Sequence, residues 1–149
     1  FPREGNGWSY KYARRQWHLV DDHDLKYHWL GDFDRELMEL IRDVKNFQAT
    51  QIVQLWDKQD DQVLAYQRKD LIFVFNFNPS QSFTDYGIIV PKGAYKAVLN
   101  TDSKEFGGFG QTDDSVVHFT QKDKSLDSGK EWLSLYLPAR SAVVLRKQK

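Results

Sequence analysis

The sequence contains no cysteine among its 149 residues. This absence excludes disulfides and thiolate metal sites, and it agrees with a reducing compartment, so we expect a cytoplasmic protein. An excess of one charge is also missing, because 21 Lys and Arg residues balance 21 Asp and Glu residues. We therefore expect no nucleic-acid partner and no anionic membrane surface. No apolar run approaches the ~20 residues that cross a bilayer, and the first residues lack the pattern of a signal peptide.

Aromatic residues, in contrast, are abundant. They make up 15% of the chain, with five Trp, seven Tyr and ten Phe. Most of them are expected in a hydrophobic core, although flat aromatic faces also stack on sugar rings. The chain begins at Phe1 rather than Met. We take it as a fragment of a longer protein, one domain in size with an appendage.

The stretch Asp70–Pro79 (DLIFVFNFNP) organises the rest of the chain. Its β-branched and aromatic residues and its closing Asn-Pro favour a strand over a short buried helix. Because successive side chains of a strand point to opposite faces, one face carries the phenylalanines and the other carries Ile72, Val74 and Asn76. A strand that is apolar on both faces is expected to be buried on both, so each face needs a covering partner.

One helical segment precedes the strands. Residues 1–24 are aromatic and irregular, but from Asp24 on apolar residues follow helical spacing. These residues are Leu30, Phe33, Leu37, Leu40, Ile41 and Val44. Asp22 or Asp24 is expected as the N-cap, and Gly31-Asp32 is expected to break the segment in two. The helix could cover the second face of the central strand, or it could belong to a larger body.

After Asn46 the apolar period falls to two, which predicts strands. The expected strands are Ile52–Asp57, Val63–Arg68, Leu71–Phe77, Tyr86–Val90, Tyr95–Asn100, Val116–Thr120, Trp132–Leu137 and Ala142–Arg146. Eight short strands with close polar turns indicate an antiparallel β-sandwich, of Greek-key type. The exception is the Gly-rich, acidic loop of residues 101–114.

No self-contained catalytic constellation is visible. The five-residue spacing of His18, His23 and His28 does not converge on a metal ion, so no metal site is expected. The run Gly107–Gly110 lacks the strand-loop-helix context of a phosphate site, which favours a tight turn. The pair Arg14-Arg15 could contact hydroxyl groups, but a structural salt-bridge role suits it better.

Several motifs resemble the 1,4-α-glucan (glycogen) branching enzymes, specifically their eukaryotic type. These motifs are FPREGN at residues 1–6, YKYARRQWHLVDD at 10–22, LKYHWL at 25–30, FDR at 33–35, FNFNPS at 75–80, TDY at 84–86, FGG at 106–108 and LPARSA at 137–142. They cover essentially the whole chain in order. Departures at Trp8, Asn78 and Phe109 touch none of the catalytic motifs of these enzymes.

The resemblance implies a C-terminal fragment of an α-amylase-superfamily enzyme. Residues 1–46 would be the last loop and helix of its catalytic (β/α)8 barrel, and residues 47–149 a mainly β, antiparallel sandwich of the α-amylase C-terminal type. The enzyme moves an α-1,4-glucan segment to a 6-hydroxyl group, making α-1,6 branches in glycogen through a covalent intermediate.

The resemblance places the catalytic carboxylates upstream of Phe1, so we expect no catalytic residue, metal or cofactor in this chain and no activity from it alone. Its partners would be glycogen, through the whole enzyme, and the missing barrel. Self-association through barrel-facing surface is a further expectation. Glucan contacts are expected from residues at the rim of the barrel, namely Trp8, Tyr12, Arg14, Arg15 and Trp17. Two alternatives remain open: a stand-alone carbohydrate-binding sandwich, and the end of another superfamily enzyme such as a debranching enzyme.

Overall fold

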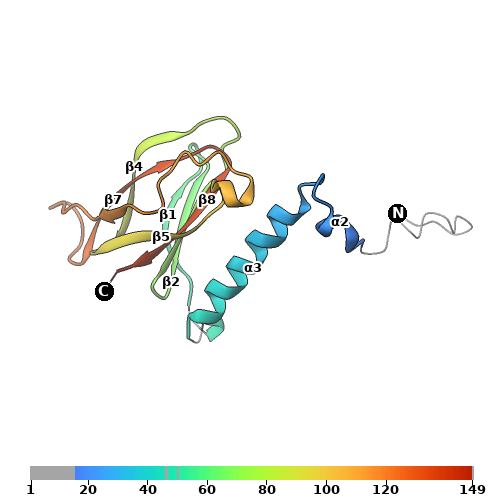
Figure 1. Cartoon of the computed structure of the whole chain (residues 1–149). Coiled ribbons are helices and arrows are strands. Elements are labelled where there is room, and N and C mark those ends of the chain that lie inside the picture. Colours follow the sequence, from blue (N-terminus) through green and yellow to red (C-terminus); the bar gives the residue numbers. More distant parts are fainter. Residues whose placement is uncertain (1–15, 46, 50, 149) are drawn as a thin grey trace, which may run out of the picture.

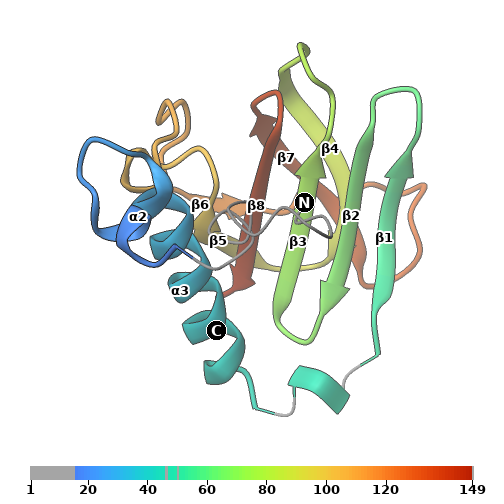
Figure 2. The same ribbon diagram turned by 90° about the vertical axis from the view of Figure 1, so that its right-hand side faces the viewer.

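The computed structural model describes residues 16–45, 47–49 and 51–148. Within these residues the helices α2 and α3 come first, and eight strands follow (Figures 1 and 2). The elements are α2 His18–Asp21, α3 Tyr27–Asp43, η2 Phe47–Ala49, β1 Val53–Lys58, β2 Val63–Arg68, β3 Leu71–Asn76, β4 Phe83–Pro91, β5 Ala94–Asn100, η3 Lys104–Phe106, β6 Val117–Phe119, β7 Lys130–Leu137 and β8 Ser141–Lys147. All eight strands predicted from the sequence are present, with ends shifted by at most a few residues.

The strands form two antiparallel sheets that lie face to face. The larger sheet has the order β1-β2-β3-β8-β5-β6, and the smaller one contains only β4 and β7. Strand β8 lies between β3 and β5, so strands distant in the sequence pair with one another, as Greek-key connections require. Figure 1 shows three layers: the small sheet, the large sheet, and α3 on the far side of the large sheet. The predicted antiparallel sandwich is therefore confirmed.

Strand β3 occupies the centre of the large sheet, as its apolar sequence predicts. It pairs over its full length with β2 on one side and with β8 on the other. Ile72 and Val74 point between the two sheets, where they contact residues of β4 and β7 such as Ile88 and Leu133. Asn76, on the same face, is buried, and its amide donates to the carbonyls of Gln81, Leu137 and Pro138. Buried polar groups need such partners.

Helix α3 covers the opposite face of β3. Leu40 and Val44 join Leu71, Phe73 and neighbouring side chains in a second apolar cluster. The expectation that the helix could cover the second face of the central strand is therefore confirmed. The cluster is less complete than the first, because Phe77, which was expected inside, lies beyond the end of β3 and is 61% exposed.

Details of the helical segment differ from the prediction. Gly31-Asp32 does not break the helix, because α3 is continuous from Tyr27. A single glycine costs only about 1 kcal/mol relative to alanine, which a packed helix of this length tolerates. Neither Asp22 nor Asp24 is the N-cap of α3: Lys26 holds that position without a side-chain bond, and the Asp22 carboxylate instead accepts from the Asp24 N–H at 3.0 Å. Part of the segment predicted as irregular forms the short helix α2.

The glycine-rich loop is wrapped around Asp102, whose side chain is buried. Its carboxylate accepts from the backbone N–H groups of Phe109 at 3.1 Å and Gln111 at 2.6 Å. Gly107 has a positive φ of 76°, and the ring of Trp29 from α3 lies where a β-carbon would be. The loop is therefore a set of tight turns, as predicted, and it also forms the surface on which the start of α3 rests.

Candidate functional site

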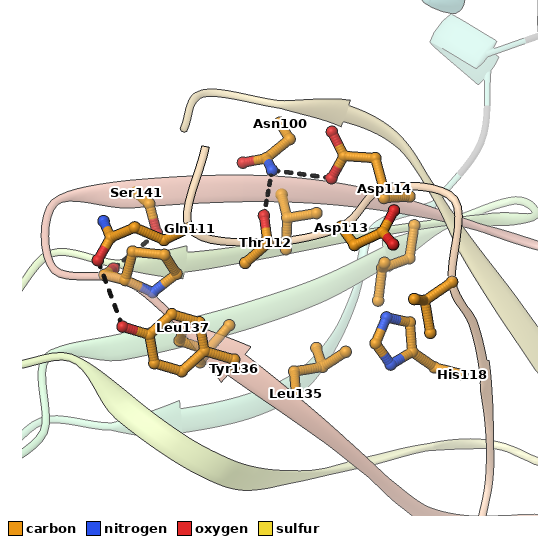
Figure 3. A pocket seen from close by; sticks show the side chains of 15 residues that line it. Asn100, Gln111, Thr112, Asp113, Asp114, His118, Leu135, Tyr136, Leu137 and Ser141 are labelled. Carbon is orange, nitrogen blue, oxygen red and sulfur yellow. Dashed lines mark hydrogen bonds between the residues drawn. The ribbon is translucent and has the colours of Figure 1, made fainter. Parts of the chain in front are cut away.

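A cavity of about 240 Å³ opens where the two sheets do not overlap (Figure 3). The small sheet has two strands and cannot cover the β5–β6 end of the large sheet, which has six. Residues 111–118 close over that end from the loop side. The floor of the cavity consists of apolar side chains from β5, β7 and β8, namely Ala97, Leu135, Leu137, Val143 and Leu145.

The polar wall of the cavity is held by a short hydrogen-bond network. The Asn100 amide donates to Thr112 Oγ1 at 2.6 Å and to Asp114 Oδ1 at 2.9 Å. On the other side of the opening, the Tyr136 hydroxyl lies 3.4 Å from Gln111 Oε1. In Figure 3, Tyr136 and Gln111 lie at one side and His118 at the other. The side chains are therefore positioned by the fold rather than free in solvent.

The charged side chains that line the cavity are both acidic. Asp113 and Asp114 contribute carboxylates, and the lining contains no Lys or Arg. Hydrogen bonds from the Ser115 hydroxyl and N–H hold the pKa of Asp113 below its ordinary value. Burial lowers the pKa of His118, which favours the neutral imidazole at neutral pH. The cavity is thus acidic to neutral, with hydrogen-bonding groups above an apolar floor.

Of the residues predicted to contact substrate, Trp17 is the one within the described part of the chain, and it does not line this cavity. Trp8, Tyr12, Arg14 and Arg15 lie outside the described residues. Trp17 comes directly before α2, and its side chain is 66% exposed. A role for these five residues in glucan contact therefore stays a prediction.

Comparison with known families agrees with this architecture. Residues 56–148 match the family model described as alpha amylase, C-terminal all-beta domain. The chain belongs to this family. The match covers all of β2 to β8 and the second half of β1, and leaves out the helical segment.

Several curated proteins are similar to nearly the whole chain, and these share the same name. The chain is 42% identical to the 1,4-alpha-glucan-branching enzyme of Candida glabrata, over 99% of the chain and 21% of that enzyme. It is 40% identical to the enzyme of the same name from Saccharomyces cerevisiae, over 97% of the chain and 21% of the enzyme. Its identity to the Felis catus enzyme is 39%, over 98% of the chain and 21% of the enzyme. The resemblance stated from the motifs is confirmed, and the chain spans about a fifth of the length of these relatives.

A second concave surface lies on the α3 side of this family domain. It measures about 430 Å³ and runs between α3 and the large sheet, lined by apolar side chains such as Leu37, Ile41 and Phe73. Tyr66 and Phe75, which stack at 5.8 Å, also line it, and Phe75 stacks in turn on Phe77 at 5.4 Å. This surface is suited to packing against protein, because most of its lining is apolar and its polar side chains are limited to Tyr66, Arg68 and Thr101.

Other unusual groups in the domain are structural. Burial raises the pKa of Tyr86 and of Tyr95 to about 12, and both hydroxyls donate hydrogen bonds, to Asp61 and to the Pro91 carbonyl respectively. Buried Glu131 accepts from Thr120 at 2.5 Å.

Among the described residues no group of three His, Asp or Glu side chains could hold a metal ion. None of the described helices is long and apolar enough to cross a membrane.

The cavity could not be predicted from the sequence. The expected strand Val116–Thr120 contains His118, but no sequence pattern links this residue to Asp113 and Asp114. Their convergence depends on which strands pair and on the small sheet being two strands wide. No local pattern encodes either fact.

Proposed function

We propose that this chain is the C-terminal part of a 1,4-α-glucan branching enzyme. The observation that carries the proposal is the similarity at about 40% identity over nearly the whole chain to enzymes of that name. The similarity includes the helical segment before residue 56, which the family model of the β domain does not contain. A stand-alone sandwich would have no reason to share that segment.

The proposed parent enzyme transfers an α-1,4-glucan segment to a 6-hydroxyl group by double displacement, which needs a carboxylate nucleophile and an acid/base group. The chain spans about a fifth of the enzymes it resembles, and the adjacent carboxylates in its cavity, Asp113 and Asp114, accept hydrogen bonds from Ser115 and Asn100 rather than forming such a catalytic pair. The chain is therefore proposed as a non-catalytic module. Its role is to brace the catalytic barrel and to contact glucan.

We place the end of the barrel at residues 1–46 and the sandwich domain at residues 47–149. Helix α3 supports this division because part of its apolar surface is uncovered. One face packs on β3, whereas the apolar side chains of Tyr27, Leu30 and Met38 are more than half exposed. An exposed apolar stripe of this kind is typical of a surface that another part of a protein covers.

The same stripe makes self-association of the isolated chain an expected property. Glucan contact through Trp8, Tyr12, Arg14, Arg15 and Trp17 belongs to this proposal as well, on the resemblance alone. For the compartment we propose the cytoplasm, since a chain without cysteine suits a reducing environment.

A domain exchange tests the proposed function. The matching C-terminal segment of the Saccharomyces cerevisiae enzyme is replaced by this chain, and the purified chimera is incubated with amylose. We expect new α-1,6 linkages in linkage analysis and a loss of iodine colour. The isolated chain, assayed in parallel, should make no branches.

Two further variants make the exchange decisive. A chimera with Leu30→Asp places a charge in the proposed barrel contact and should lose activity or thermal stability. The matched control, Lys58→Asp, changes an exposed residue at the end of β1 and should behave as the parent chimera. Branches formed by the isolated chain, or a well-folded chimera without activity, would contradict the proposal.

A further inference from the structure

The cavity between β7 and residues 111–118 lies on the side of the large sheet that α3 does not touch. Its floor residues Val143 and Leu145 point between the sheets, whereas Val144, between them in the sequence, packs in the cluster with α3. A protein body that covers the exposed stripe of α3 would therefore leave the cavity open. Access to the cavity is independent of the surfaces discussed above.

The lining selects the charge of a ligand. Asp113 and Asp114 would repel an anion, and no cationic side chain lines the cavity to hold a phosphate or carboxylate. Lys96 lies close enough to interact with Asp113 but is not part of the lining. The remaining ligand classes are neutral molecules and cations.

The hydrogen-bonding capacity of the wall favours a ligand with hydroxyl groups. The two imidazole nitrogens of His118 make no hydrogen bond within the described part of the chain. The Asp114 interaction with Asn100 uses Oδ1 only, and both hydrogen bonds that Asp113 accepts also end on Oδ1. The second oxygen of each carboxylate is thus available to accept from a ligand. Hydroxyl groups can donate to these oxygens and exchange hydrogen bonds with the imidazole.

The apolar floor and the volume of the cavity restrict the class and size of the ligand further. A small cation such as an ammonium group gains nothing from apolar surface, whereas the C–H face of a pyranose ring can lie on the partly exposed side chains of Ala97, Val116 and Val143. Sites for drug-sized molecules measure roughly 300–1,000 Å³, so the volume of about 240 Å³ suits one small ring. Tyr136, at the rim, adds aromatic surface beside the floor.

We infer that this cavity is a binding site for a single neutral hexose unit, with Asp113, Asp114 and His118 contacting its hydroxyl groups and Val143 its apolar face. The hexose chemistry follows from the lining. That the hexose is the end of an α-glucan rests on the proposed function. The site would then hold a glucan end on the face of the sandwich opposite α3.

The test is a titration of the isotope-labelled 149-residue chain with maltose, followed by amide chemical shifts. We expect saturable shifts confined to residues 111–118 and 134–138. Glucose 1-phosphate, which is anionic, should bind at least several-fold more weakly than maltose. Because this titration reads binding and the domain exchange reads branching, the failure of one leaves the other result intact.

Two matched substitutions locate the site. Asp114→Asn keeps the oxygen that accepts from Asn100 but replaces the second acceptor with a donor, and it should weaken maltose binding about tenfold. Asp60→Asn makes the same change in an exposed turn at the far edge of the large sheet and should have no effect. The inference is overturned if maltose causes no saturable shifts, if Asp114→Asn binds as well as the unmodified chain, or if putrescine perturbs these residues and maltose does not.

Discussion

The two faces of β3 carry apolar clusters of different completeness. Between the sheets, Ile72 and Leu133 are fully buried, at 0% exposure, and every partner comes from the strands. On the α3 side, Leu40 retains 9% exposure and Phe73 6%, and the cluster needs the helix to exist. The first cluster is closed by the sandwich itself, whereas the second is one side of a larger contact.

The comparison indicates which part of the chain folds independently. The sandwich buries its interior without help, so its stability should depend little on neighbouring parts of a longer protein. Helix α3 is held by the sheet on one face only, and apolar side chains such as Leu30 and Met38 remain exposed on it. We therefore expect α3 to be the first part of the described chain to open, as elements with fewer buried contacts generally are.

The largest expected effect comes from the same substitution made in both clusters. Leu133→Ala removes a fully buried side chain between the sheets and should cost about 3–5 kcal/mol of unfolding free energy. Leu40→Ala acts where the surroundings can relax, and its cost should be about 2 kcal/mol. Urea denaturation followed by circular dichroism measures both. Equal urea midpoints for the two variants would show that the contact of α3 with the sheet is packed as tightly as the interior of the sandwich.

A pair of glycine substitutions tests the contact between α3 and the loop. A β-carbon at Gly107 would lie 2.2 Å from the Trp29 ring, and φ there is positive at 76°. Gly107→Ala should cost about 2–3 kcal/mol, through displacement of Trp29 as well as backbone strain. Gly129 also has a positive φ, of 90°, but nothing lies within 4 Å of its β-carbon position. Gly129→Ala should therefore cost only about 1 kcal/mol, the strain alone.

Hydrogen exchange shows where the glycine effect acts. In Gly107→Ala we expect faster exchange along α3 and unchanged protection of β3 and β7. Faster exchange throughout the sandwich would mean instead that the loop around Asp102 supports the strands directly.

Much of this architecture could be predicted from the sequence because it depends on local periodicity. The alternation in each strand and the double apolar character of β3 follow from side-chain direction alone. The spacing of Leu37, Leu40 and Val44 likewise predicts the face of α3 that packs on the sheet. The predicted break at Gly31 is wrong, because the low helix propensity of glycine is a weak signal that tertiary packing overrides.

Features that depend on strand pairing could not be predicted. The cavity exists because β4 and β7 form a sheet narrower than the one they cover, and sheet width has no local signature. The same holds for Asp102, which is one acidic residue among several in its loop until its carboxylate is seen to accept two backbone N–H groups. The resemblance to branching enzymes identified the family but pointed to Trp17 and its neighbours, not to this cavity.

A smaller effect on the stability of the chain is expected when the pH is lowered through the titration of His118. Because burial lowers the pKa of His118 in the folded chain, the unfolded chain binds the proton more readily. Stability is then highest above the ordinary pKa of about 6.5 and falls as pH drops below it. Replacing His118 by Asn should make the urea midpoint depend less on pH between about pH 7 and 5. This range lies above the pH at which ordinary carboxylates titrate. Identical profiles for the two proteins would exclude this role of His118.

The smallest effect on stability is expected at Leu30, an exposed apolar residue near the start of α3. Its side chain is 69% exposed, so Leu30→Asp should change the unfolding free energy of the chain by no more than about 0.5 kcal/mol. The same substitution should nevertheless reduce self-association in light scattering at high protein concentration, because it places a charge in the stripe of Tyr27, Leu30 and Met38. Val98→Asp, at another exposed apolar position on β5, is the control and should leave association unchanged. If Leu30→Asp destabilised the chain as much as Leu40→Ala, the stripe would be part of the fold itself, and the contrast between the two sides of α3 would not hold.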